Sequence, residues 1–452
     1  GRPLAACYHS RPADTAPTEI QDVPAIAARL APLLGEPEAC AAMTTEIEGK
    51  KALGRRFHYL RRWIDRDIAE RIRAEGVVGV ELREEPRREY PHGNAAAAVI
   101  GAVTDYRGRL KGLTGLERIC EMTLKGEPGS CLIFKTARAE PIHIFPETEL
   151  EPLAGRDVHT TLEVAIQQIT EQALDRLQER FTPKRCAAVV VNPKTGEILA
   201  MAGRPGLDLN DRDPKGLHVP AVQDTYEPGS TIKPLIAAWA LTRGAVDAGR
   251  IFDCGPGWKR FGWRVLHDVK ANGPLDLEGI LIKSSNIGIA QVGQELGLEE
   301  LHRALSLVGF GRKTGIELPG EPNGKLPPLA EWKENEHDVS VSMGHGFAVT
   351  PLQLAVAYSA LLNGGWRIQP TLLPDADRRD PVRVPFSPEA RAFALATMEK
   401  VVAEGTGRRA RIEGLRVGGK TGTSEGYGAD KGKYDSSFVG FAPANDPRLL
   451  VV

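Results

Sequence analysis

The sequence lacks a long hydrophobic run and an excess of charge of either sign. No stretch of its 452 residues approaches the roughly 18 apolar residues that a membrane-crossing helix requires, and its start shows no secretory signal. Lys and Arg total 58 and Asp and Glu total 59. Polyanion-binding proteins usually carry a basic excess or stripe, and no basic run interleaved with aromatic residues occurs here. Nucleic acid is therefore not expected as a partner.

Paired-cysteine motifs are also missing. None of the cysteines forms a C-x-x-C pair, and no histidine pair stands nearby at the spacing of a zinc site. The pattern favours scattered buried thiols, and a disulfide between Cys120 and Cys131 stays open. We expect no metal and no cofactor. The six cysteines are Cys7, Cys40, Cys120, Cys131, Cys186 and Cys254.

The length predicts two or three domains, and the patterning changes near residue 155. Residues 1–155 are uneven, with a helical stretch at Ile26–Leu34, an arginine-rich segment at Arg55–Arg73 and a strand-like piece at Val77–Leu82. The arginine-rich segment is typical of a solvated helix face. We therefore expect an extended α+β module with a modest core, followed by a second domain over residues 156–452.

Two strand–turn–strand signals lie far apart in the second domain. One joins Ala187–Asn192 to Glu197–Met201, and the other joins Ser437–Phe441 to Leu449–Val452. Between them, apolar residues recur at helical spacing. The pattern predicts an α+β fold in which distant segments form one antiparallel sheet around a helical insert. Because the chain stops inside the last strand, we expect this domain to be truncated. The expected helices are Thr231–Leu241, Leu277–Leu296, Leu298–Leu307, Pro351–Leu362 and Pro388–Val402.

The first chemical signal is a serine three residues before a lysine. In Tyr226–Pro234 (YEPGSTIKP), Ser230 falls near a helix start, and Lys233 lies on the same helix face. A serine hydroxyl becomes a good nucleophile when a base takes its proton, and a lysine in a dry pocket can be that base. A helix N-terminus also favours developing negative charge. Because Ser-x-x-Lys alone is common, the assignment of a nucleophile and its base needs support from elsewhere.

A second polar cluster interrupts an apolar stretch at Ser284-Ser285-Asn286. Serine and asparagine sit poorly in a helix interior because they compete with the backbone for hydrogen bonds. A helix cap would explain the cluster. The chemical interpretation is that Ser284 relays a proton to a leaving group and Asn286 orients a substrate amide, with Ser285 in the substrate-binding set.

The third cluster, Lys420-Thr421-Gly422-Thr423, follows two glycines in a segment that reads as a strand and turn. Glycines in a strand often mark close approach of a ligand to the backbone. Lys420, Thr421 and Thr423 would suit a substrate carboxylate. Residues 414–421 also match the phosphate-binding loop G-x-x-x-x-G-K-[ST], but a helix does not follow and too few residues remain for a nucleotide-binding sheet.

Together, Ser-x-x-Lys, Ser-x-Asn and Lys-Thr-Gly occur in the order found in penicillin-interacting serine enzymes. The chain resembles the class B penicillin-binding proteins over nearly its whole length. Glu227–Pro234 is similar to the family's E-P-G-S-T-x-K-P, and Lys283–Asn286 and Lys420–Thr423 to its K-S-S-N and K-T-G-T. Segments 346–354 and 191–202, and 1–5, 88–91, 112–117 and 124–126 in the N-terminal part, resemble further family segments. The short span from Arg88 to Glu117 and the K-S-S-N form of the second motif resemble the division-type branch more than the elongation-type branch.

The resemblance implies a peptidoglycan D,D-transpeptidase in septal cell-wall synthesis. Ser230 would form the acyl-enzyme with release of D-Ala, and penicillins would acylate the same residue. Backbone N–H groups of Ser230 and Thr423 would form the oxyanion hole, Ser284 and Lys420 would assist proton transfer, and Ser285, Thr421, Gly422 and Thr423 would contact substrate or β-lactam. Residues 1–155 would be a non-catalytic pedestal or dimerisation-like domain.

The resemblance also implies a single N-terminal anchor, absent from this chain, in the bacterial cytoplasmic membrane, with the catalytic domain outside it. A membrane glycosyltransferase and other cell-wall synthesis proteins would be partners. Two alternatives stay open: a β-lactamase or D,D-carboxypeptidase with the same nucleophile, and a β-lactam sensor or scaffold. A plain β-lactamase has no need of residues 1–155.

Four residues near these motifs are expected to play lesser roles. We expect His345 to have a structural role or to lie at the rim of the site, because the Ser-Lys scheme needs no histidine and no orienting carboxylate stands at motif spacing. Trp258 and Trp263 are more typical of buried aromatic residues than of a cleft lining. Glu227 is expected either to tune the lysines or to anchor its loop.

Overall fold

The computed structural model describes residues 3–77, 79–82, 85–106, 109–135, 141–206, 209, 218–425 and 432–452. The chain forms two compact units, one from most residues up to Arg156 and the other from Asn94–Val99 and most residues after Asp157. In the described part of the chain, no helix is long and apolar enough to span a membrane. The side chain of Cys131 lies outside the described residues, so the disulfide with Cys120 that the sequence leaves open is untested.

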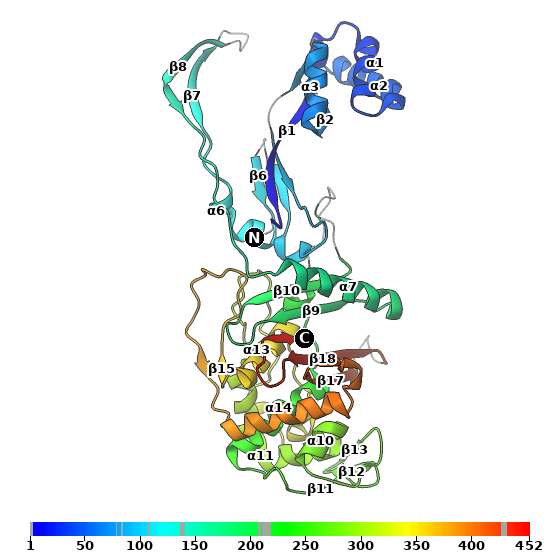
Figure 1. Ribbon diagram of the computed structural model, residues 1–452, viewed down its shortest axis with the longest axis vertical. Coiled ribbons are helices and arrows are strands. Elements are labelled where there is room, and N and C mark those ends of the chain that lie inside the picture. Colours follow the sequence, from blue (N-terminus) through cyan, green and yellow to red (C-terminus); the bar gives the residue numbers. More distant parts are fainter. Residues whose placement is uncertain are drawn as a thin grey trace. The chain divides into compact units, whose positions relative to one another are not determined.

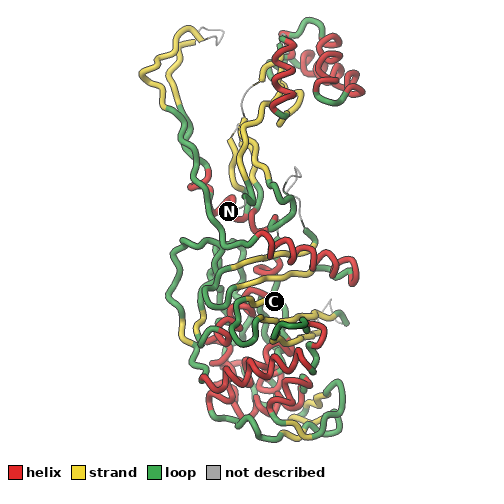
Figure 2. The backbone as a smooth tube through the Cα atoms, viewed as in Figure 1, coloured by secondary structure: helices red, strands yellow, loops and turns green. Residues whose placement is uncertain are grey.

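The first unit combines small sheets with short helices (Figures 1 and 2). Strand β1 pairs antiparallel with β2, β3 and β4. Apolar side chains such as Leu30, Ile47 and Ile72 form a modest core, as the sequence predicts. The elements are β1 Ala6–Thr15, α1 Val23–Leu33, α2 Cys40–Ala52, β2 His58–Ile64, α3 Arg66–Glu75, β3 Val80–Leu82, β4 Glu85–Glu89, β5 Val103–Tyr106, β6 Arg109–Gly112, α5 Gly115–Ile119, α6 Glu121–Leu124, β7 Ser130–Lys135 and β8 Pro141–Leu150. Helix α4, Ala97–Ile100, belongs mostly to the second unit.

The prediction that Arg55–Arg73 forms a solvated helix face was wrong for its first half. Residues His58–Ile64 form strand β2, and only the part from Arg66 is helical. Leu60 and Ile64 pack on the core while β2 pairs with β1. Tertiary pairing therefore decides the conformation here in place of local propensity.

The second unit is built on a five-stranded antiparallel sheet in the order β10-β9-β19-β18-β17. β9 (Cys186–Val191) and β10 (Ile198–Arg204) form one hairpin, and β17 (Gly418–Glu425), β18 (Tyr434–Ala442) and β19 (Leu449–Val451) come from the far end of the chain. This arrangement confirms the predicted sheet of distant segments. β17 stands at the sheet edge, where it is open to ligands.

Helices pack on both ends of the sheet (Figure 1). Helix α7 (Val164–Phe181) lies along β10, and α14 (Pro388–Ala403) lies along the edge strand β17. At the centre, α9 (Lys233–Arg243) packs against α14 and α11, and all its residues from Lys233 to Ala240 are buried. A helix that is apolar on all sides is expected inside a core. The remaining helices are α8 Pro220–Gln223, α10 Leu277–Lys283, α11 Asn286–Val308, α12 His337–Ser342 and α13 Pro351–Leu362.

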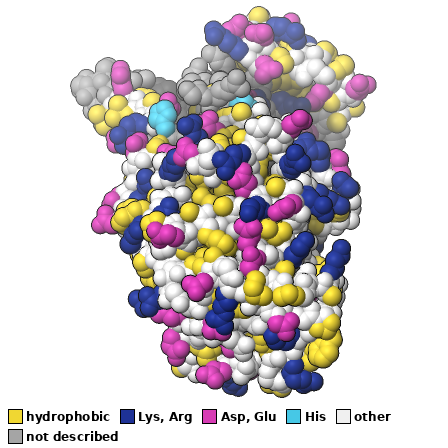
Figure 3. Space-filling model, turned by 60° about the horizontal axis from the view of Figure 1, so that its bottom comes forward, with side chains coloured by type: hydrophobic (Ala, Val, Ile, Leu, Met, Phe, Trp, Pro, Cys, Tyr) yellow, Lys and Arg dark blue, Asp and Glu magenta, His cyan; other side chains and the backbone are white. Residues whose placement is uncertain are grey.

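Short two-stranded sheets complete the second unit. β11 (Phe252–Asp253) pairs with β14 (Pro274–Leu275), β12 (Trp258–Phe261) with β13 (Arg264–His267), and β15 (Trp366–Arg367) with β16 (Val382–Arg383). On the face that Figure 3 draws, cationic and anionic side chains are interspersed, in keeping with the near-zero net charge.

Candidate active site

Ser230 occupies a short 3-10 turn, Gly229–Ile232, that leads directly into α9. Gly229 holds this turn close to β17. Its φ is +54°, and a Cβ atom there would lie 2.7 Å from the carbonyl oxygen of Thr423. Only glycine fits such an approach without displacement. Ser230 itself is partly exposed, whereas its neighbours Gly229 and Thr231 are buried.

Lys233, the first residue of α9, is completely buried. Its Nζ donates hydrogen bonds to the carbonyl oxygens of Ser284 (2.8 Å) and Ser285 (3.2 Å) and to Oδ1 of Asn286 (2.8 Å). Burial lowers the pKa of Lys233 well below its usual range, and the nearby Lys420 lowers it further, while Asp268 opposes the shift. A lysine in this setting can be neutral at physiological pH, as a general base must be.

The Ser284–Asn286 segment forms a sharp break between two helices. The expected continuous helix over Leu277–Leu296 was wrong, because α10 ends at Lys283 and α11 begins at Asn286. Ser284 takes a left-handed φ of 59°, and the hydroxyl of Ser285 caps α11 by accepting from the N–H of Gly288 at 2.9 Å. Ser285 therefore caps a helix, as one interpretation of the sequence predicts, in the same segment that the other interpretation assigns to catalysis.

Lys420, on β17, contacts the break between α10 and α11. Its side chain is fully buried, and Nζ donates to the hydroxyl of Ser284 at 2.8 Å and to the carbonyl of Thr421 at 3.0 Å. Burial lowers the pKa of Lys420 to about 7. Ser284 is thus in contact with both buried lysines, through its carbonyl to Lys233 and through its hydroxyl to Lys420.

The rest of the Lys-Thr-Gly-Thr segment lines the open edge of β17. Thr423 is exposed, and Thr421 is partly exposed with its hydroxyl donating to that of Thr406 at 2.9 Å. Gly422 lies so close to the serine turn that a Cβ there would be 2.8 Å from the carbonyl of Pro228. Because Lys420 lies inside an antiparallel edge strand, the fold excludes the phosphate-binding loop, which needs a strand-to-helix turn.

Asp268 is a site residue that the sequence analysis missed. Its carboxylate accepts from the Ser285 hydroxyl (2.6 Å) and from the backbone N–H groups of Asn286 (2.6 Å) and Ile287 (3.1 Å). The side chain of Asn272 also donates to it at 2.9 Å. Asp268 therefore fixes the start of α11 and the orientation of Asn286 toward Lys233. It stands 17 residues before Ser285 with no motif around it, so only the fold could identify it.

His345 has an orienting carboxylate that motif spacing does not reveal, because it stands 118 residues away in the chain. His345 Nδ1 lies 2.7 Å from Oε2 of Glu227, and the other carboxylate oxygen accepts from the N–H of Gly346 at 2.9 Å. The carbonyl of Glu227 also accepts from the hydroxyl of Ser424 at 2.8 Å. Glu227 thus anchors its loop, and His345 supports it from outside the Ser-Lys cluster.

Trp258 and Trp263 also depart from expectation. Instead of being buried, they are 53% and 73% exposed. Both belong to the β12–β13 hairpin, which ends one residue before Asp268. Among the described residues, no group of three His, Cys, Asp or Glu side chains is arranged to hold a metal ion.

The site combines a serine at a helix start, two buried lysines that share a second serine, and an open edge strand beside them. These are the parts of a serine acyl-transfer centre that uses lysine in place of histidine.

Comparison with known proteins agrees with this class. Residues 186–452 match the penicillin-binding protein transpeptidase domain, and residues 1–160 match the penicillin-binding protein dimerisation domain. A probable peptidoglycan D,D-transpeptidase PbpC of Pseudomonas aeruginosa is 34% identical, over 94% of this chain and 74% of the relative. The peptidoglycan D,D-transpeptidase FtsI of Escherichia coli is 31% identical, over 100% of this chain and 77% of the relative.

A solved structure is also similar. The transpeptidase domain of penicillin-binding protein 3 from Burkholderia pseudomallei, in its apo form, is 31% identical with a TM-score of 0.59. The match covers 65% of this chain and 86% of that one. The chain belongs to the class B penicillin-binding proteins, of the division type. The predicted family, fold class and peptidoglycan transpeptidase function are confirmed, and nothing in these comparisons supports the hydrolase or sensor alternatives.

Proposed function

We propose that Ser230 forms the acyl-enzyme through which this protein crosslinks peptidoglycan stem peptides during septal wall synthesis. The observation that supports it most is the convergence of Lys233 and Lys420 on Ser284, next to the serine turn. Two cations are costly to bury side by side, so the arrangement favours a neutral Lys233 that can accept a proton beside Lys420.

In the first half-reaction, Lys233 takes the proton of Ser230, and the serine Oγ attacks the carbonyl between the last two D-alanines of a stem peptide. The Oγ–C bond forms as the C–N bond breaks. A proton reaches the leaving amine through the Ser284 hydroxyl, which is hydrogen-bonded to Lys420 at 2.8 Å. Free D-alanine leaves, and the acyl group stays on Ser230.

In the second half-reaction, the amine of a neighbouring stem attacks the acyl carbon and loses a proton to the same lysine–serine set. Ser230 regains its proton, and a new amide bond joins the two stems. Backbone N–H groups of Ser230 and Thr423 are proposed as the oxyanion hole, where each donor is worth about 10²–10³ in rate.

The open edge of β17 is proposed to hold the substrate carboxylate. Lys420 supplies positive charge, and Thr421 and Thr423 supply hydroxyl donors on the same strand. Ser285 and Asn286 complete the substrate-binding set at the helix break, and Gly422 lets the strand approach the serine turn. A β-lactam, whose carbonyl and carboxylate mimic D-Ala-D-Ala, would occupy the same positions and acylate Ser230.

We further propose that residues 1–155 form a non-catalytic pedestal and residues 156–452 the catalytic domain. The protein would be tethered by a single N-terminal anchor in the bacterial cytoplasmic membrane and would act outside it. A membrane glycosyltransferase and other cell-wall synthesis proteins would be its partners. The membrane-synthesised glycan is the logical source of donor stems.

A transpeptidation assay with purified lipid-linked or polymeric donor separates the proposed function from hydrolysis. The protein is expected to release D-alanine together with crosslinked stem dimers, and Ser230→Ala is expected to release neither. Release of D-alanine with only trimmed, uncrosslinked stems would identify a carboxypeptidase instead. Product formation by Ser230→Ala would contradict the nucleophile.

A further inference from the structure

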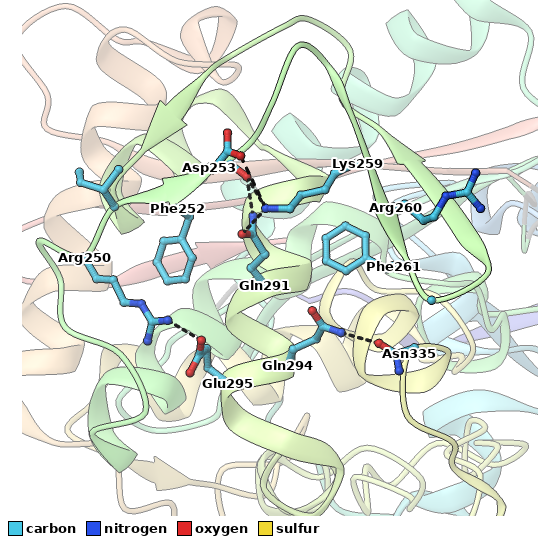
Figure 4. A pocket seen from close by; sticks show the side chains of 12 residues that line it. Arg250, Phe252, Asp253, Lys259, Arg260, Phe261, Gln291, Gln294, Glu295 and Asn335 are labelled. Atoms are coloured by element: carbon cyan, nitrogen blue, oxygen red, sulfur yellow. Dashed lines mark hydrogen bonds and ion pairs between the residues drawn. The ribbon is translucent and has the colours of Figure 1, made fainter.

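The β12–β13 hairpin has one face turned into the protein. Phe261 and Leu266 on this face are 4% and 8% exposed. Lys259 lies beside them, and its Nζ donates to the carbonyl of Asp253 and to the side chain of Gln291, both at 2.9 Å. In Figure 4, these groups and Phe261 border a polar hollow between the hairpin and α11, whereas Arg260 points away from it.

The opposite face of the hairpin is aromatic, cationic and open to solvent. Because successive strand residues point to opposite faces, and Trp258 pairs with His267 and Arg260 with Val265, these four side chains share the outer face. Trp263 stands at the turn with 73% of its surface exposed. Because large aromatic rings are usually buried in the fold, two exposed tryptophans on one hairpin indicate a binding surface.

The turn of the hairpin is held from the inner face, where Arg264 pairs with Phe261. The guanidinium of Arg264 lies 5.8 Å from the centre of the Trp263 ring and donates to the carbonyl of Glu336 at 3.3 Å and to the Ser340 hydroxyl. Gln294 in turn donates to Asn335 at 2.8 Å, beneath the hairpin turn. A platform fixed before binding loses little conformational entropy when a ligand docks.

The hairpin runs directly into the active site. The residue after His267 is Asp268, which holds Ser285 and Asn286, and the carbonyl of His267 accepts from the side chain of Asn286 at 3.3 Å. A polymer bound along the outer face would therefore continue toward the segment that contacts Lys233.

The charge of the hairpin also selects its ligand. Lys259 and Arg264 are engaged by the protein on the inner face, which leaves Arg260 and Lys270 exposed, and the single acidic residue of residues 258–270, Asp268, is engaged by the helix break. Arg260 is exposed and has no ion-pair partner among the described residues, so it is available to an anionic group. A ligand with apolar ring faces and scattered carboxylates fits both features.

We propose that the exposed surface of this hairpin, with Trp258, Arg260, Val265 and His267 on its outer face and Trp263 at its turn, binds a peptidoglycan strand outside the serine site. The tryptophan rings pack against the sugar rings, and Arg260 pairs with a free carboxylate of a stem peptide. This inference rests on the proposed function, since it assigns the polymer from which the acceptor stem is presented.

The test is co-sedimentation of the whole protein with purified insoluble peptidoglycan. The double variant Trp258→Ala/Trp263→Ala is expected to bind at least fivefold more weakly than wild type, and Trp258→Tyr/Trp263→Tyr is expected to recover most of the binding. Trp366→Ala is the matched control: Trp366 is 43% exposed on another hairpin, with Arg383 lying 5.1 Å from its ring. It is expected to bind like wild type.

Equal sedimentation of the double variant and wild type would overturn the proposal, as would an equal loss in Trp366→Ala. A double variant that loses binding only to vesicles of anionic phospholipid and keeps its binding to peptidoglycan is a further outcome. That result would also overturn the proposal, because the hairpin would then bind a membrane surface. If thermal melting shows the double variant unfolded, Trp263→Ala alone decides, because this ring lies at the turn. Acylation of wild-type protein by penicillin, measured separately, tests the serine site, so the two failures are distinguishable.

Discussion

Lys420 donates a hydrogen bond to the hydroxyl of Ser284 at 2.8 Å, from a strand that is 136 residues away in the chain. The carbonyl of the same serine accepts from Lys233. One residue at a helix break therefore connects the two buried lysines, and the protonation state of each depends on the other. The predictions below follow from this connection and from the residues that hold it in place.

The rate of acylation by a penicillin is expected to rise as Lys233 loses its proton and to level off well below pH 10.5. Lys233 has to be neutral to take the serine proton, and burial and Lys420 lower its pKa well below the ordinary lysine value of 10.5. Burial brings the pKa of Lys420 to about 7. Stopped-flow acylation from pH 5 to pH 10 measures the profile. A rate that keeps rising up to pH 10 would contradict the neutral-lysine mechanism.

Burial of Lys420 is expected to make stability pH-dependent. In the unfolded chain, this lysine keeps its proton up to about pH 10.4, whereas the folded protein releases it near pH 7. The free energy of unfolding should therefore rise with pH between these values, by about 1–3 kcal/mol relative to Lys420→Met. Denaturant unfolding at pH 6 and pH 9 measures it. Lys283→Met, which removes an exposed lysine, is the control and should leave the slope unchanged.

Asp268→Asn is expected to slow acylation by about ten- to a hundredfold, because it loosens Ser285 and Asn286, which orient the groups around Lys233. The pH profile should also shift to lower pH, since the charge of Asp268 raises the pKa of Lys233. A purely structural role would lower the rate without this shift. Asp253→Asn, at a carboxylate that is 76% exposed on the neighbouring strand, should change neither quantity.

Gly229→Ala is expected to reduce acylation by at least a hundredfold and to lower stability by about 1–3 kcal/mol. Its φ of +54° strains any other residue, and the new methyl group would lie 2.7 Å from the Thr423 carbonyl, so the turn and β17 would have to separate. Gly244→Ala is the matched control, with φ of +68° and no atom within 4 Å of the added Cβ. Gly244→Ala should lower stability only by the strain of a positive φ, and its acylation rate should stay near that of wild type. Equal losses in both variants would show that proximity to β17 is unimportant.

Much of this site is predictable from the sequence because its parts are local patterns. Ser230 and Lys233 stand three residues apart at a helix start, and Ser284–Asn286 form a polar cluster in an apolar run, although the helical pattern predicts one helix through them and not the break that the structure has. The sheet is predictable in outline because its strand–turn–strand signals are strong.

The rest depends on contacts between distant segments. Asp268 has no motif and becomes a site residue only when the β12–β13 hairpin places it against Ser285. The pairing of Glu227 with His345 joins residues 118 positions apart. Exposure of Trp263 could not be predicted, because an isolated tryptophan is more often buried and its surroundings are set by the fold.

Intact-mass analysis after incubation with a penicillin tests the central claim most directly. The protein is expected to gain one stable adduct, located on Ser230 by peptide mapping and absent from Ser230→Ala, while Lys233→Ala should gain it at less than a hundredth of the wild-type rate with a similar melting temperature. Rapid turnover of the antibiotic without an adduct, or an adduct that persists in folded Ser230→Ala, would contradict the account.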